Sequence, residues 1–124
     1  MKGIGIDTTS VAKTRDLLEA LGRTYVDNLY TPAEQREYEK ASEPAVYLAG
    51  RFAVKEAVFK AIAHLLDEKT FDLRVVETLD AADGSPSITV SEELADILSR
   101  AGASKLFVSI TTEGDAATAI VVAC

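Results

Sequence analysis

Charged residues in the middle of the chain follow a pattern that suits chemistry. Residues 47 to 61 read Tyr-Leu-Ala-Gly-Arg-Phe-Ala-Val-Lys-Glu-Ala-Val-Phe-Lys-Ala, a helical sequence. At about 100° per residue, Val54, Val58 and their apolar neighbours gather on one side, whereas Glu56 and Lys60 lie nearly opposite. A carboxylate and an ammonium beside small residues leave room for a ligand. The alternative is an ordinary solvated face, where such a pair contributes only about 0.3–0.5 kcal/mol.

Two more basic residues lie in the same segment. Arg51 and Lys55 are four residues apart, so they share one face of the helix. Guanidinium and ammonium groups are both suited to binding phosphates. The pair therefore indicates an anion-binding surface next to Glu56 and Lys60.

The N-terminal segment ends in a carboxylate. Isoleucines alternate with glycines from Gly3 to Ile6, which predicts a short strand ending at Asp7. Glycine in a strand permits close approach of a ligand or another chain. Asp7 either binds a metal ion or simply starts a turn into the next helix, and the pattern alone leaves both open.

The next predicted element is a helix from Val11 to Gly22, with N-cap oxygens available between residues 7 and 10. Its expected buried residues are Val11, Thr14, Leu17, Leu18 and Leu21. Three basic residues on the outward face are candidates for a docking surface: Lys13, Arg15 and Arg23. The alternative is a solvated face without a partner.

The elements that follow alternate between helix and strand. Thr31-Pro32-Ala33-Glu34 is a capping-box sequence that starts a short helix, and the long central helix is expected from about Pro44 to Leu66. His64 lies in its last turn and is interpreted as a helix-end residue. The remaining predicted elements are strands at 71–79, 87–90, 105–111 and 116–123 and a helix at 91–101. The pattern predicts one α+β domain over residues 1–124, with an antiparallel sheet packed against the central helix.

Composition narrows the classes of function. The 124 residues carry a net charge of −7, and the excess of acidic residues follows Ile62, because nine acidic and nine basic residues precede that point. Without a basic stripe or any tryptophan, general nucleic-acid binding is not expected. The apolar runs are too short to span a bilayer, and the single cysteine, Cys124, cannot form an intrachain disulfide. We expect a cytoplasmic protein without a membrane partner.

Four segments together resemble one family. They are Gly3-Ile4-Gly5-Ile6-Asp7, the segment Leu48 to Ala57 with Lys60, the turn Gly84-Ser85-Pro86, and Val108-Ser109-Ile110. In this order, and over nearly the whole chain, they are similar to the small holo-acyl-carrier-protein synthase type of 4'-phosphopantetheinyl transferase. The central segment is highly specific, whereas the turn and the Val-Ser-Ile strand are weak signals alone.

The resemblance implies magnesium-dependent transfer of the phosphopantetheine arm from coenzyme A to a serine of an apo acyl carrier protein, releasing 3',5'-adenosine bisphosphate. Asp7 and Glu56 match the family's metal-binding carboxylates, and Lys60 matches its lysine beside the diphosphate. The serine proton passes to Glu56 directly or through a metal-bound water. Residues matched to the coenzyme A pocket are Arg51, Lys55, Lys60, Gly84 and Pro86.

The resemblance also implies partners. It predicts a homotrimer with sites at the subunit interfaces, and a carrier that docks on the basic face of the first helix, where Lys13, Arg15 and Arg23 lie. One alternative function is a non-catalytic module of the same fold that binds the carrier or coenzyme A. That alternative is favoured by residues 61–65, Ala-Ile-Ala-His-Leu, which stand where the family usually has a Gly-Thr-Gly loop.

Overall fold

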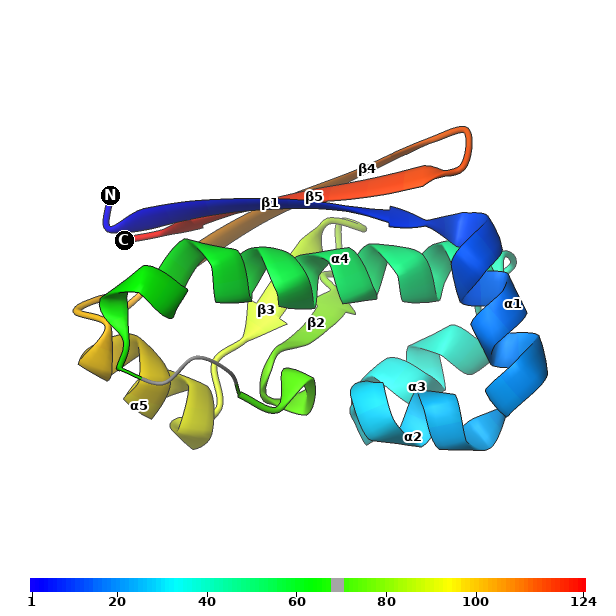
Figure 1. Cartoon of the computed structure of the whole chain (residues 1–124), viewed down its shortest axis with the longest axis horizontal. Coiled ribbons are helices and arrows are strands. Elements are labelled where there is room, and N and C mark those ends of the chain that lie inside the picture. Colours follow the sequence, from blue (N-terminus) through cyan, green and yellow to red (C-terminus); the bar gives the residue numbers. More distant parts are fainter. Residues whose placement is uncertain (68–70) are drawn as a thin grey trace.

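The computed structural model describes residues 1–67 and 71–124. Its elements are β1 (Gly3–Ser10), α1 (Val11–Leu21), α2 (Arg23–Leu29), α3 (Pro32–Glu39), α4 (Pro44–Ile62), β2 (Glu77–Asp80), β3 (Pro86–Thr89), α5 (Glu92–Arg100), β4 (Leu106–Glu113) and β5 (Ala116–Ala123), with 3-10 turns at Ala63–Leu65 and Leu73–Val75. A three-stranded sheet covers one side of α4, and the β2–β3 hairpin crosses behind α4 in the view of Figure 1, where β3 contacts β4. The predicted α+β class, with an antiparallel sheet on a long central helix, is confirmed.

The three-stranded sheet is antiparallel in the order β1-β5-β4. Its inner face packs on α4, and fully buried alanines and a valine of β5 contribute to the core there. Its outer face carries exposed apolar side chains: Ile4, Ile6, Phe107 and Ile120, which are between 39 and 58% exposed. No element among the described residues covers this outer face.

The apolar side of α4 is the centre of the core. Val54, Ala57, Val58 and Ala61 are fully buried, as the helical periodicity predicts. They contact residues of α5 and of the sheet, including Leu94. Burial of each larger aliphatic side chain contributes roughly 1.5–3 kcal/mol, so α4 is held by hydrophobic contacts on two sides.

The glycines of β1 allow the strand to lie directly on α4. A Cβ atom at Gly3 would overlap the carbonyl oxygen of Ala61, and one at Gly5 would overlap that of Ala57. The close approach that glycine predicts is therefore real, but its partner is the backbone of α4. Any larger residue at either position would push the strand away from the helix.

Several predicted boundaries are wrong. Helix α4 ends at Ile62, not Leu66, and residues 23–29 form a helix that the periodicity did not indicate. Gly22, at φ +57°, ends α1 and precedes α2. Leu17 and Leu21, expected to be buried, are 44% and 53% exposed. They remain exposed because α1 packs on the core mainly through its first turns, where Val11 and Thr14 are buried.

The expected strand at 71–79 is also wrong over most of its length. Residues Leu73–Val75 form a 3-10 turn, capped by Asp72 through the backbone amide of Arg74 at 2.9 Å. The carbonyl groups of Leu73 and Val76 accept hydrogen bonds from the buried ammonium of Lys55. An isolated buried charge requires such oxygen partners, so tertiary contacts override the alternating pattern.

Candidate active site

Strand β1 brings Asp7 to the face of α4 that carries Glu56 and Lys60. Side chains of a strand alternate between its two faces, so Gly5 and Asp7 point to the same side. Gly5 lies against Ala57, and the next inward-facing residue, Asp7, therefore meets the helix near Glu56 and Lys60. The strand and the helix thus place two carboxylates and one ammonium at a single location.

Asp7 is held by contacts on both of its carboxylate oxygens. Lys60 Nζ donates to Asp7 Oδ1 at 3.0 Å and to the carbonyl oxygen of Ile6 at 3.1 Å. Thr9 Oγ1 donates to Asp7 Oδ2 at 3.0 Å. The Asp7 side chain is only 16% exposed, whereas that of Lys60 is 52% exposed. Lys60 therefore remains accessible to an anionic ligand while it orients Asp7.

Glu56 lies beside this pair with its carboxylate unpaired. Within residues 1–67 and 71–124, no group donates a hydrogen bond to it or forms an ion pair with it. Burial raises the pKa of the Glu56 carboxyl group, the negative charge of Asp7 raises it further, and Lys60 opposes both effects. Two neighbouring carboxylates, of which only Asp7 is bonded to the Lys60 ammonium, leave negative charge that a cation would neutralise.

The donor set fits magnesium. Mg²⁺ prefers carboxylate oxygens and usually takes one or two of them, completing its shell with water and substrate phosphates. Asp7 and Glu56 supply that number. No cluster of three or more histidine, cysteine, aspartate or glutamate side chains occurs in the described parts of the chain, so a site built entirely of protein ligands is not found there.

A cleft of about 770 Å³ opens beside these residues. Asp7, Glu56 and Lys13 contribute to its polar part, while Tyr25 and Phe52 contribute to an apolar wall. A volume of this size lies in the range of small-molecule sites, which are mostly apolar with a few convergent polar groups. The cleft can therefore hold a small-molecule ligand next to the carboxylates.

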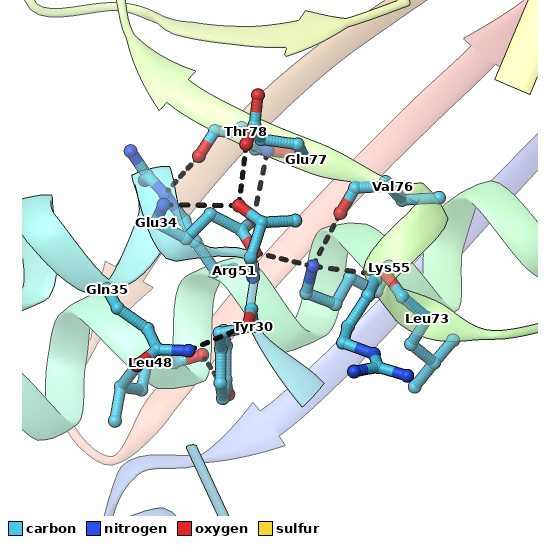
Figure 2. A network of polar contacts seen from close by, with 12 residues as sticks. Tyr30, Glu34, Gln35, Leu48, Arg51, Lys55, Leu73, Val76, Glu77 and Thr78 are labelled. Atoms are coloured by element: carbon cyan, nitrogen blue, oxygen red, sulfur yellow. Dashed lines mark hydrogen bonds and ion pairs between the residues drawn. The ribbon is translucent and has the colours of Figure 1, made fainter. Parts of the chain in front are cut away.

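Lys55 does not face this cleft, which corrects its predicted role in coenzyme A binding. Its ammonium donates to Glu34 Oε1 at 2.8 Å and to the carbonyl oxygens of Leu73 and Val76, and Figure 2 shows these contacts converging. The side chains of Lys55 and Glu34 are both 0% exposed. An ammonium has three N–H donors, so none is left for a phosphate.

Arg51 is likewise committed to the fold. Its Nε donates to the carbonyl oxygen of Thr78 at 3.1 Å, and its Nη2 donates to Asp80 Oδ1 at 2.7 Å. The guanidinium also lies 4.3 Å from the centre of the Tyr47 ring. With only 7% of the residue exposed, Arg51 attaches α4 to β2 through Nε and Nη2, and its phosphate role stays a prediction.

Comparison with known proteins shows the family to which the chain belongs. Residues 3–121 match the model of the 4'-phosphopantetheinyl transferase superfamily. The chain belongs to this superfamily. It is 36% identical to a holo-[acyl-carrier-protein] synthase of Thiobacillus denitrificans over 120 residues, covering 97% of this chain and 91% of that protein.

Solved structures of the superfamily have the same fold. The crystal structure of holo-[acyl-carrier-protein] synthase from Neisseria meningitidis has a TM-score of 0.88 and 31% identity, covering 99% of this chain and 98% of that one. The Helicobacter pylori synthase in complex with coenzyme A has a TM-score of 0.82 and 25% identity, covering 98% and 99%. The resemblance inferred from four short segments is thereby confirmed.

The other residues matched to this superfamily's sites lie apart from the carboxylates. Gly84, at φ +86°, is in the exposed turn between β2 and β3, and Pro86 begins β3. Neither contributes to the cleft that contains Asp7 and Glu56. Within one chain, the structure does not bring this turn together with Asp7 and Glu56.

The three proposed docking residues do not all lie on one helix. Lys13 and Arg15 are exposed on α1, and Lys13 also lines the cleft. Arg23 is instead the first residue of α2, which corrects its predicted place on the first helix. Its guanidinium is near Asp27 and Glu39, at 3.6 and 3.8 Å, but these exposed ion pairs are weak.

Sequence reasoning missed Asp115. This residue, in the turn between β4 and β5, lines the cleft and accepts hydrogen bonds from Ser10 Oγ at 2.6 Å and from the amide of Ala12 at 2.7 Å. The predicted hairpin turn Glu113-Gly114-Asp115 was the available signal. Its contact with residues more than 100 positions away could not be predicted from spacing.

Proposed function

We propose that the protein transfers the 4'-phosphopantetheine arm of coenzyme A to a serine hydroxyl of an apo acyl carrier protein, with magnesium required. The observation that carries the proposal is that Asp7 and Glu56 line one ligand-sized cleft while Lys60 binds Asp7. Membership of the superfamily and the coenzyme A complex of the Helicobacter pylori relative support the choice of substrate.

Asp7, Glu56 and Lys60 each have a separate role in the proposed reaction. Asp7 and Glu56 would hold Mg²⁺, which when bound supplies charge neutralisation at the diphosphate. The carrier serine oxygen forms a bond to the β-phosphorus of coenzyme A as the bond to the bridging oxygen breaks, releasing 3',5'-adenosine bisphosphate. Glu56, whose carboxylate has no hydrogen-bond donor among the described residues, accepts the serine proton. Lys60 stabilises the negative charge on the departing phosphate.

The carrier docks through local positive charge despite the net charge of −7. At physiological ionic strength the Debye length is about 8 Å, so distant carboxylates are screened. Lys13 and Arg15 on α1, together with Arg23 on α2, provide the local charge that an acidic recognition helix requires. Higher salt should therefore weaken binding of the carrier.

The protein assembles as a homotrimer in this proposal. The resemblance supplies the number of subunits, and the uncovered outer sheet face supports the assembly. Ile4, Ile6, Phe107 and Ile120 are exposed on that face and form an apolar surface suited to a second copy of the chain. Sites at subunit interfaces would also explain why Gly84 and Pro86 lie apart from Asp7 within one chain.

Two further features belong to the proposal. Residues 1–124 act as a single domain, and the reaction takes place in the cytoplasm. No helix in the described part of the chain has the length and apolar character needed to cross a membrane. Cell fractionation of the tagged protein tests the location.

The direct test is mass spectrometry of an apo carrier protein incubated with the protein, coenzyme A and magnesium chloride. We expect a mass gain equal to one phosphopantetheine arm, lost when magnesium is chelated. Asp7→Asn and Glu56→Gln should each abolish the gain while the circular-dichroism melting curve stays near that of the wild type. Transfer retained in either variant at saturating magnesium would reject the assignment of the carboxylates.

The non-catalytic alternative makes a different prediction. The missing glycine loop after Lys60 favours it, since residues 61 and 62 continue α4 instead. A binding module would retain affinity for the carrier or coenzyme A in calorimetry but give no mass gain under any magnesium concentration. That outcome would replace the transferase proposal.

A further inference from the structure

The turn between β4 and β5 reaches the start of α1. The backbone carbonyl of Asp115 accepts a hydrogen bond from the amide of Val11 at 2.8 Å. Its side-chain Oδ1 accepts from the amide of Ala12 at 2.7 Å, and its Oδ2 accepts from Ser10 Oγ at 2.6 Å. One residue of the hairpin therefore makes three contacts with the junction between β1 and α1.

These contacts complete the N-terminus of α1. The first amides of a helix have no partner within the helix. Here Val11 and Ala12 donate to Asp115, and Lys13 donates to Ser10 Oγ at 3.1 Å. Because Ser10 Oγ also donates to Asp115, the serine hydroxyl links the carboxylate to the third amide. The first turn of α1 contains no acidic residue, so Asp115 supplies the negative charge that a helix N-terminus favours.

The hairpin is a firm support for this cap. Strand β5 pairs with β1 along its whole length, from Gly3 opposite Ala123 to Ser10 opposite Ala116. Gly114, at φ +59°, forms the turn that presents Asp115 at the end of β5. Asp115 is therefore fixed relative to the same strand that carries Asp7.

Strand β1 passes into α1 without an intervening loop. Ser10 ends the strand and Val11 begins the helix, so the direction of α1 is determined at this junction. Lys13, three residues further, lines the same cleft as Asp7 and Glu56. A change in the first turn of α1 would move Lys13 relative to the two carboxylates.

We propose that Asp115 is a positioning residue that sets the orientation of α1, and with it the placement of the carrier-docking residues Lys13 and Arg15, relative to the reacting groups. The inference rests on the proposed function for its kinetic consequence, but not for its structural one. Asp115 touches neither Asp7 nor Glu56 in any contact of the described chain. Both of its carboxylate oxygens accept hydrogen bonds from the start of α1, so its contacts are those of a helix cap.

The kinetic test uses Asp115→Ala in the full-length protein, with Glu93→Ala as a control of equal charge change on the exposed start of α5. Loss of a helix cap lowers the fraction of molecules with an ordered first turn, which should raise the apparent KM for the apo carrier roughly five-fold. The rise in the carrier KM should exceed any change in kcat or in the KM for coenzyme A, and Glu93→Ala should change none of these three constants. Asp115→Asn keeps a side-chain oxygen for the amide of Ala12 and should recover part of the loss.

A second measurement does not depend on activity. Hydrogen–deuterium exchange of the metal-free protein, read at residues 11–13 by NMR, should become faster in Asp115→Ala and remain unchanged in Glu93→Ala. If wild-type protein transfers nothing but the exchange changes as expected, the proposed function fails and the cap stands. Unchanged exchange would overturn the proposal, as would an equal loss of kcat for all substrates or a shift in magnesium dependence with an unchanged carrier KM.

Discussion

Replacing Lys55 by methionine should lower the stability of the fold without raising the KM for coenzyme A. The ammonium of Lys55 donates to Glu34 of α3 and to the backbone carbonyls of Leu73 and Val76. Figure 2 shows that these three contacts join α4 to the two segments. In Lys55→Met, the carboxylate of Glu34 would remain fully buried without its counter-charge. The backbone amides of Thr31 and Thr78 would then be the only partners of that carboxylate among the described residues.

The expected loss is large because the pair is completely buried. Removing one partner of a buried ion pair typically costs about 3–5 kcal/mol. For a chain of this size, each kcal/mol lowers Tm by roughly 3–5 °C, so Lys55→Met should melt about 10–20 °C below the wild type. Thermal unfolding followed by circular dichroism measures this difference, and urea unfolding at 10 °C gives the free energy directly.

A matched control lies five residues further along the same helix. Lys60→Met makes the same chemical change at a side chain that is 52% exposed, so its ion pair with Asp7 contributes at most about 1 kcal/mol. It should melt within a few degrees of the wild type yet lose transfer. Adding Glu34→Gln to Lys55→Met should restore part of the lost stability, because no charge is then left buried. A melting temperature for Lys55→Met equal to that of Lys60→Met, or a raised KM for coenzyme A in folded Lys55→Met, would refute this account.

Three other outcomes follow from the structure. Gly5→Ala should lower stability by about 1–3 kcal/mol and reduce transfer, since the added Cβ overlaps the carbonyl of Ala57; a melting curve and activity like the wild type would contradict the strand–helix contact. In metal-free protein, NMR titration should place the pKa of Glu56 above its usual 4.5, and Asp7→Asn should lower that pKa. Between pH 4.5 and the raised pKa, Glu56 is protonated in the folded state but ionised in the unfolded state. The free energy of unfolding should therefore fall as pH rises through this range. Ile6→Lys, on the outer sheet face, should give monomers in sedimentation velocity if the proposed trimer forms through that face, and a monomeric wild type at micromolar concentration would reject the proposed assembly.

The helical and strand patterns predicted the architecture well where periodicity determined burial. The capping box at Thr31 and Glu34 is present with both reciprocal hydrogen bonds, at 3.2 and 3.0 Å. The buried positions of α4 and the final hairpin also follow local rules. The same rules failed for Leu17 and Leu21, because amphipathicity shows which side of a helix is apolar but not whether anything covers it.

Candidate site residues could be predicted from the sequence where two charged side chains lie on the same face of one helix. Glu56 and Lys60 lie four residues apart, so their shared helix face follows from that spacing, whereas their proposed role required the resemblance. Asp7 required the resemblance, since nothing local distinguishes a metal carboxylate from the first residue of a turn. Lys55 was misassigned because its partner, Glu34, comes from α3, and only the tertiary structure shows that an apparently exposed basic residue is buried.

Lys55 and Glu56 are adjacent on α4 but have different surroundings, because their side chains point in directions about 100° apart. Lys55 points into the core, where its ammonium meets three oxygens, and Glu56 points toward the cleft. Rotation of α4 about its axis would pull the ammonium from those oxygens, and leaving such a charge buried and unpaired is strongly unfavourable. The buried pair therefore fixes the rotation of the helix, while Gly5 fixes the distance of β1 from it. Together these two contacts determine the position of the Glu56 carboxylate relative to Asp7. The geometry of the accessible site therefore depends on buried residues that a substrate would not touch.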